Sequence, residues 1–125
     1  MNRKQFIKSQ GGTCANWTWS WSFINEEAEI IIFGVWDIYE DLGKTMIFSE
    51  EWKTNNKGRK QKGYDETKEH LRLIEEEGYI LKVFKMEYSN IDPDDETSRA
   101  KIKSFDPVLY RKTLIKIDEN YYAVN

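Results

Sequence analysis

Three of the five tryptophans stand in the segment 16–23, NWTWSWSF, where Trp17, Trp19 and Trp21 alternate with small hydroxylated residues. This alternation is the period of a β-strand, whose successive side chains point to opposite faces. A row of indole rings on one face either packs into a core or forms an aromatic wall for a flat ligand. The segment therefore raises two interpretations, a packed core and a binding site.

The segment 29–37 is apolar at nearly every position, which predicts a strand buried on both faces, and Gly34 within it indicates a bulge or a close backbone approach. A fourth tryptophan, Trp36, lies near the end of this segment and is followed by Asp37. If the two segments pair through a turn at 25–28, Trp36 and Asp37 come close to the row of rings. Such a group suits a flipped nucleobase, because the rings stack on its faces while the carboxylate accepts from an exocyclic amine. The expected base pocket consists of Trp17, Trp19, Trp21, Trp36 and Asp37.

A basic stretch at 53–62, KTNNKGRKQK, contains five cations and no acid, although the net charge of the chain is −3. Cations grouped in this way can neutralise the phosphates of a nucleic acid, whatever the total charge. The residues expected to bind phosphate are Lys53, Lys57, Arg59, Lys60 and Lys62. Taken alone, this stretch could also be a solvated loop without a partner. The basic stretch and the aromatic pocket together favour nucleic-acid binding.

The residue types that carry catalysis are scarce. His70 is the only histidine and falls within a predicted helix, and Cys14 is the only cysteine. Neither has a neighbour in sequence that would activate it, and no glycine-rich phosphate loop follows a predicted strand. We expect no enzymatic activity, no cofactor and no metal site, and binding is the better class of function.

The hydrophobic patterns predict a single α+β domain over residues 1–125, with one main helix. Asp65 is the expected N-cap of that helix and Gly78 its end. The many strands favour a strongly curved, mostly antiparallel sheet or a small pseudo-barrel. The predicted elements are a helix at 3–9, strands at 16–24, 29–37 and 45–50, the main helix within 64–79, a strand at 79–88, and, after an acidic loop at 89–98, a strand, a short turn of helix and a hairpin turning at 118–120.

The first ten residues lack the apolar core of a signal peptide, and no apolar run approaches the roughly 18 residues of a membrane span. A single cysteine agrees with a reducing compartment. The sequence therefore predicts a cytoplasmic protein without a membrane partner.

Several motifs occur in an order that resembles one family. They are GGTCANWTWSWSFIN, IIFGVWD, SEEW followed by KGRKQKGY, EHLRLIEEEGY, and AKIKSF near the C-terminus. Together they resemble the N-terminal domain of bacterial HNH endonucleases of the modification-dependent, type IV-like restriction class. The resemblance covers the chain from about Phe6 to Ala123.

The resemblance implies a PUA-like reader, similar to the SRA and EVE groups, that flips a modified cytosine such as 5-methylcytosine into an aromatic pocket. The implied partners are double-stranded DNA with a modified base and a nuclease domain normally fused C-terminally. The chain has one Cys and one His, so the zinc cysteines and paired histidines of an HNH nuclease are absent and we expect no DNA cleavage. The alternative is a domain that binds a small ligand or a peptide in the same tryptophan-lined pocket.

Overall fold

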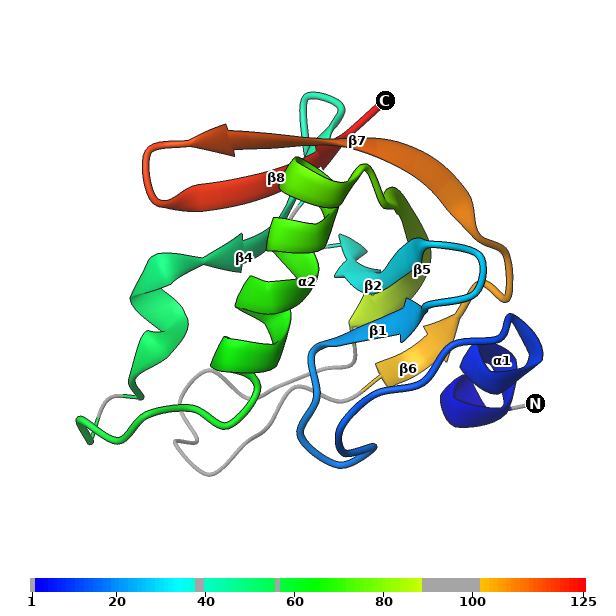
Figure 1. Ribbon diagram of the computed structural model, residues 1–125, viewed down its shortest axis with the longest axis horizontal. Coiled ribbons are helices and arrows are strands. Elements are labelled where there is room, and N and C mark those ends of the chain that lie inside the picture. The colour runs from blue at the N-terminus through cyan, green and yellow to red at the C-terminus, as the bar shows by residue number, and fades with distance from the viewer. Residues whose placement is uncertain (1, 38–39, 56, 89–101) are drawn as a thin grey trace.

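The computed structural model of the protein describes residues 2–37, 40–55, 57–88 and 102–125 (Figure 1). In these ranges the elements are α1 (Arg3–Ser9), β1 (Ser22–Asn25), β2 (Ile30–Trp36), β3 (Glu40–Asp41), β4 (Lys44–Ser49), the 3-10 helix η2 (Glu50–Lys53), α2 (Tyr64–Glu77), β5 (Ile80–Tyr88), β6 (Ile102–Phe105), β7 (Tyr110–Ile117) and β8 (Asn120–Val124). The predicted α+β class is confirmed. The acidic loop expected at 89–98 lies outside the described residues.

The strands form one mixed sheet in the order β1-β2-β5-β7-β8-β4-β3, with β6 added beside β5. Among the described strands, β2 and β5 are the one parallel pair, and every other pairing is antiparallel. The mostly antiparallel sheet is therefore confirmed. The parallel pair lies second and third along the sheet, and α2 belongs to the connection between its strands.

The sheet is strongly curved. β4 stands four places from β2 along the sheet, a separation of about 19 Å if the sheet were flat, yet the two strands approach within 8 Å. The bend lies in β7, whose first three residues pair with β5 and whose remaining five pair with β8. The described strands do not close into a barrel, so the curved open sheet is the form observed.

The parallel strands β2 and β5 are packed on both faces. On one face Ile31 and Phe33 of β2 and Leu81 of β5 pack with Leu71 of α2. On the other face Ile32 of β2 and Phe84 and Met86 of β5 pack with Phe6 and Ile7 of α1, in a second cluster. This explains why β2 is apolar at nearly every position, as the sequence predicted for a strand buried on both sides.

The two helices begin and end at local signals. The side chain of Asn2 caps α1 and forms a capping box with Gln5. The N-cap of α2 is Gly63, so the prediction of Asp65 is wrong: the helix starts earlier, and Asp65 lies in its first turn, where a carboxylate also stabilises it. Gly78 ends α2 as predicted, with a left-handed backbone at φ +74°. Neither described helix is long and apolar enough to cross a membrane.

The strand predicted at 16–24 is wrong over its first half. Residues 17–19 form a turn and β1 begins only at Ser22. The Ser20 N–H donates to the Asn16 carbonyl at 2.9 Å and closes the turn. Two side chains reinforce it: Asn16 Oδ1 accepts from the Thr18 N–H at 2.8 Å, and Ser20 Oγ accepts from the Asn16 N–H at 3.0 Å. Such local hydrogen bonds compete with the ladder of a sheet. The small hydroxylated residues that suggested alternation thus help to break the strand.

The turn of helix expected after β6 is also wrong, since residues 106–109 are irregular. Pro107 has no N–H to donate, and the Asp106 carboxylate accepts from the Tyr110 hydroxyl at 2.7 Å, which fixes the entry to β7. The hairpin turning at 118–120 is confirmed by the pairing of β7 with β8.

A candidate ligand-binding cavity

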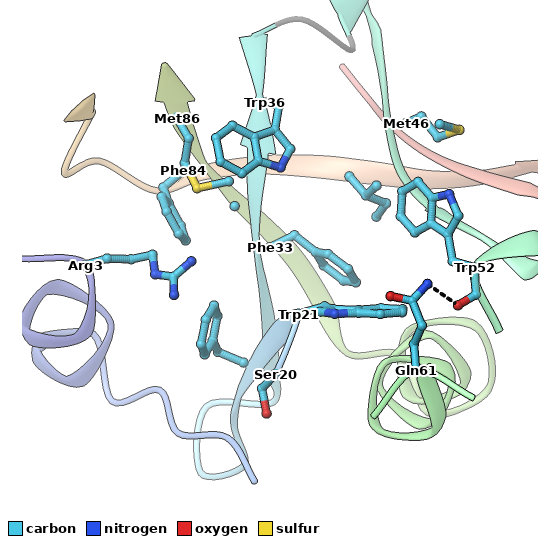
Figure 2. Close-up of a pocket in the computed structure, with 13 residues that line it drawn as sticks. Arg3, Ser20, Trp21, Phe33, Trp36, Met46, Trp52, Gln61, Phe84 and Met86 are labelled. Atoms are coloured by element: carbon cyan, nitrogen blue, oxygen red, sulfur yellow. Dashed lines mark hydrogen bonds between the residues drawn. The ribbon is translucent and has the colours of Figure 1, made fainter. Parts of the chain in front are cut away.

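A cavity of about 450 Å³ lies beside the end of β2 (Figure 2). The ladder between β1 and β2 stops where Ser22 pairs with Phe33, so residues 34–36 of β2 extend beyond β1. The cavity occupies the space next to this extension. Its volume falls within the range of roughly 300–1,000 Å³ that is typical of small-molecule sites.

Six of the thirteen lining residues are aromatic, and the lining draws on both core clusters. Three tryptophans contribute to it, Trp21 before β1, Trp36 at the end of β2 and Trp52 in η2, and they come from separate parts of the sequence. In Figure 2 the rings of Trp21 and Trp52 lie on the side of the α2 segment, while Trp36 lies beside Met86. The remaining lining residues are Arg3, Ser20, Phe23, Phe33, Gly34, Met46, Ile47, Gln61, Phe84 and Met86.

Two glycines set the walls of the cavity. A Cβ atom at Gly34 would lie 2.8 Å from side-chain atoms of Met86 and Phe84. A Cβ atom at Gly63 would lie 2.7 Å from the indole of Trp21. Real Cβ atoms do not approach so closely, so these positions have to be glycine for the surrounding rings to sit where they do. The sequence predicted a bulge or a close approach at Gly34, and the close approach is the one observed.

The basic stretch is joined to the cavity at both ends. Trp52 and Gln61 line the cavity, and the chain between them carries most of the predicted phosphate-binding cations. The Gln61 side-chain amide donates to the Trp52 carbonyl at 2.8 Å, and the Gln61 N–H donates to the Lys53 carbonyl at 2.8 Å. Figure 2 shows the first of these bonds at the wall of the cavity. The basic stretch is thus a closed hairpin held against the cavity.

The tip of this hairpin is fixed by one side chain. Asn55 Oδ1 accepts from the N–H groups of Lys57 and Arg59, at 2.9 and 3.0 Å, and the Asn55 N–H donates to the Arg59 carbonyl. Gly58 supplies the left-handed backbone that the turn requires, with φ +76°. Hydrogen bonds to Asn55 therefore hold the backbone of Lys57 and Arg59, on either side of Gly58.

The cations of the hairpin differ in how they are paired. The ammonium of Lys60 forms an exposed ion pair with Asp65 at 2.6 Å. The other four cations are exposed and form no ion pair with any residue of the described chain; they are Lys53, Lys57, Arg59 and Lys62.

Arg3 brings one cation into the aromatic lining. Figure 2 shows its side chain reaching from α1 toward the rings, and its guanidinium carbon lies 5.9 Å from the ring centroid of Phe23. Burial lowers the pKa of Arg3, and the nearby thiol of Cys14 opposes this effect. The Arg3 guanidinium has no hydrogen bond and no ion pair with any described residue.

The five residues that were expected to form one pocket do not lie together: two line the cavity and three do not. Trp21 and Trp36 line the cavity. Trp17 stacks on Phe23 outside it, with ring centroids 5.6 Å apart, and Trp19 is half-buried and not part of the lining. Asp37 is exposed and borders a separate cavity of about 140 Å³, which it shares with Trp36. The turn at 17–19 is the physical reason, because it takes two rings away from the face that a continuous strand would have given them.

Of the thirteen lining residues only Trp21 and Trp36 were anticipated as site residues, and the eleven others include Arg3, Trp52 and Gln61. The signal for Trp52 was its position, a large ring directly before a run of cations. Nothing near Arg3 in the sequence connects it with Trp21 or Trp52, since α1 is placed at the cavity by the packing of Phe6 and Ile7 in the second core cluster.

Of the two groups that could support catalysis, His70 is buried and Cys14 is half-buried. His70 Nδ1 lies 2.6 Å from Ser22 Oγ, and the fully buried Ser22 also bonds Thr67. Burial lowers the pKa of His70, and burial raises the pKa of the Cys14 thiol, which disfavours a thiolate. Within the described ranges no three His, Cys, Asp or Glu side chains are grouped so that they could hold a metal ion.

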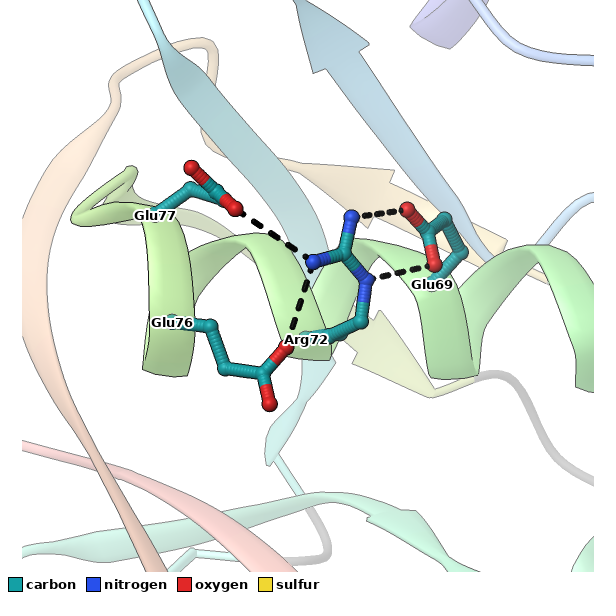
Figure 3. Close-up of polar contacts among 4 residues, drawn as sticks. All are labelled: Glu69, Arg72, Glu76 and Glu77. Atoms are coloured by element: carbon teal, nitrogen blue, oxygen red, sulfur yellow. Dashed lines mark hydrogen bonds and ion pairs between the residues drawn. The ribbon is translucent and has the colours of Figure 1, made fainter.

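The outer face of α2 has the opposite charge from the hairpin. Arg72 contacts three carboxylates, those of Glu69 at 2.6 Å, Glu76 at 3.1 Å and Glu77 at 3.5 Å (Figure 3). One cation among three acids leaves this face negative. A polyanion would meet the hairpin and avoid the outer face of α2.

Comparison with known proteins found no matching family model, no matching curated protein and no matching solved structure. The function is therefore argued from the cavity and the charges around it.

Proposed function

We propose that this chain is a DNA-binding module that recognises a modified base, a modified cytosine, by flipping it into the aromatic cavity. The observation that supports it is that Trp52 and Gln61, at the two ends of the basic hairpin, line the same cavity as Trp21 and Trp36. A base in the cavity would be stacked between rings while the cations beside it meet the phosphates of its own strand.

The division of roles follows from the placement of the residues. Trp21, Trp36 and Trp52 stack on the base, and each stacked ring contributes about 1–3 kcal/mol. The exposed cations of the hairpin fix the strand without reading its sequence. On this proposal the curved sheet is a PUA-like scaffold, and the module is the reading part of a restriction system whose nuclease is a separate domain.

Binding to matched duplexes tests the proposal. Fluorescence polarisation is measured with duplexes that differ at one base, cytosine, 5-methylcytosine or 5-hydroxymethylcytosine, at two salt concentrations. Trp36→Ala is expected to weaken binding of the preferred duplex by roughly 5- to 100-fold. Trp17→Ala is the matched control, because it removes the same ring from a position outside the cavity. Circular dichroism checks the fold of both variants.

Two results would contradict the proposal. Equal loss with Trp36→Ala and Trp17→Ala would mean that the tryptophans act through stability rather than by stacking. No binding of any duplex at low salt would favour the second candidate, a small-ligand site, which the volume of the cavity also suits.

A further inference from the structure

The cavity contains one cation that nothing in the described chain neutralises. Arg3 is half-buried among aromatic rings, and its guanidinium has five N–H donors in a planar fork. No described residue accepts a hydrogen bond from it or pairs with its charge. Its one ring contact, with Phe23 at 5.9 Å, uses the flat face and leaves the donors at the edge unused.

An unpaired guanidinium in such a place is unfavourable for the free protein. Taking a charged group out of water costs free energy unless hydrogen bonds replace those to water. The lowered pKa of Arg3 has this origin, because burial is its main cause. Lys4 and Lys8 on the same helix are exposed and lie over Trp17, at 5.6 and 5.8 Å, so their charges remain in solvent.

We infer that Arg3 determines which ligand the cavity accepts, and that this ligand is a flat ring bearing a carboxylate. A carboxylate fits because its two oxygens match the fork of a guanidinium in a bidentate pair. The surrounding rings exclude water and strengthen the pair. For a base in DNA the inference rests on the proposed function, and the corresponding base is a cytosine with a carboxyl group at C5.

The binding test uses duplexes with cytosine, 5-methylcytosine, 5-formylcytosine or 5-carboxylcytosine. The unmodified protein is expected to prefer the carboxyl duplex. Arg3→Gln is expected to weaken that duplex about tenfold or more and the methyl duplex less than twofold. Lys4→Gln removes the same charge from an exposed site one residue away, and it should weaken all four duplexes alike. Equal effects of Arg3→Gln on the carboxyl and methyl duplexes would overturn the inference.

Free probes separate this inference from the proposed function. Indole-3-carboxylate and indole-3-carboxamide have the same shape and differ in charge. Arg3-dependent preference for the carboxylate, with no binding of any duplex, would support the ligand assignment and overturn the DNA function. The opposite result is binding of duplexes that depends on the tryptophans, with a selectivity among duplexes that Arg3→Gln leaves unchanged. It would support the DNA function and overturn the ligand assignment. If neither the duplexes nor the probes bind, both are wrong.

A stability measurement tests the role of Arg3 without any ligand. Arg3→Met keeps the length of the side chain and removes the charge, and no hydrogen bond is lost in the free protein. The urea midpoint of Arg3→Met is therefore expected to equal or exceed that of the unmodified protein. A lower midpoint would show that Arg3 serves the fold and would overturn the inference.

Discussion

The wall of the cavity formed by Trp21 depends on the absence of a side chain at Gly63. Gly63 has φ −78° and ψ −9°, an ordinary helical backbone that alanine also adopts. A Cβ atom there would lie 2.7 to 2.8 Å from three atoms of the Trp21 indole. Gly63→Ala is therefore a test of packing, free of backbone strain.

The size of the effect follows from these distances. An ordinary carbon contact begins near 3.4 Å, so the indole must move by roughly 0.7 Å to relieve the overlap. The ring is rigid and lies against Phe48 and Trp52, with centroid distances of 6.2 Å to each. Overpacking of this kind typically costs about 1–3 kcal/mol. We expect that loss in the free energy of unfolding, together with weaker binding in the cavity.

Urea unfolding followed by circular dichroism measures the loss, and a double-mutant cycle identifies its cause. In a Trp21→Leu background the indole is gone, so Gly63→Ala should cost less than about 0.5 kcal/mol. An equal loss in both backgrounds would assign the effect to the N-cap of α2 and refute the packing argument. No loss in either background would mean that the indole has free room to move.

Three further changes test other parts of the structure. His70→Gln is expected to lower the free energy of unfolding by about 1–3 kcal/mol at pH 7.5, because the buried Ser22 loses the shorter of its two side-chain hydrogen bonds and keeps only that to Thr67. Burial lowers the pKa of His70, so the unfolded chain binds a proton first and stability falls as the pH drops below about 6.5; urea titrations across pH should show a smaller fall in the variant. Arg72→Ala should leave the urea midpoint nearly unchanged, since its ion pairs are exposed, and a large shift would contradict this. Replacing Lys57 and Arg59 with Gln should reduce the slope of log K against log salt by about 2 if both meet phosphates, whereas an unchanged slope would exclude them from the interface.

Local patterns were sufficient to predict several elements. The sequence of α2 gave its end at Gly78, because only a residue tolerant of a left-handed backbone fits there. The apolar run of β2 indicated burial on both faces, which the two core clusters confirm. The turn at 118–120 was recognisable from the residues between two alternating segments.

Non-local pairing was not predictable in this way. The parallel ladder between β2 and β5 joins strands that are separated by β3, β4, the basic hairpin and α2. Neither segment contains a signal that identifies the strand with which it pairs, since both are apolar on two faces. The position of Arg3 at the cavity could not be predicted for the same reason, because it depends on how α1 packs on β5.

The cavity exists because the tryptophan row is not a strand. The register between β1 and β2, continued backward, would place Trp19 opposite Trp36 and cover the end of β2. Backbone and side-chain hydrogen bonds of Asn16 and Ser20 close a turn instead, and β1 starts three residues beyond Trp19. Trp17 then supports Phe23, and Trp21 faces the space left beside β2. The sequence left open whether the tryptophans form a core or a pocket. Because of this turn, Trp17 packs against Phe23 and Trp21 lines the cavity. Asn16→Ala, which removes the side-chain bond to the Thr18 N–H, should accordingly change binding in the cavity although Asn16 is not part of the lining.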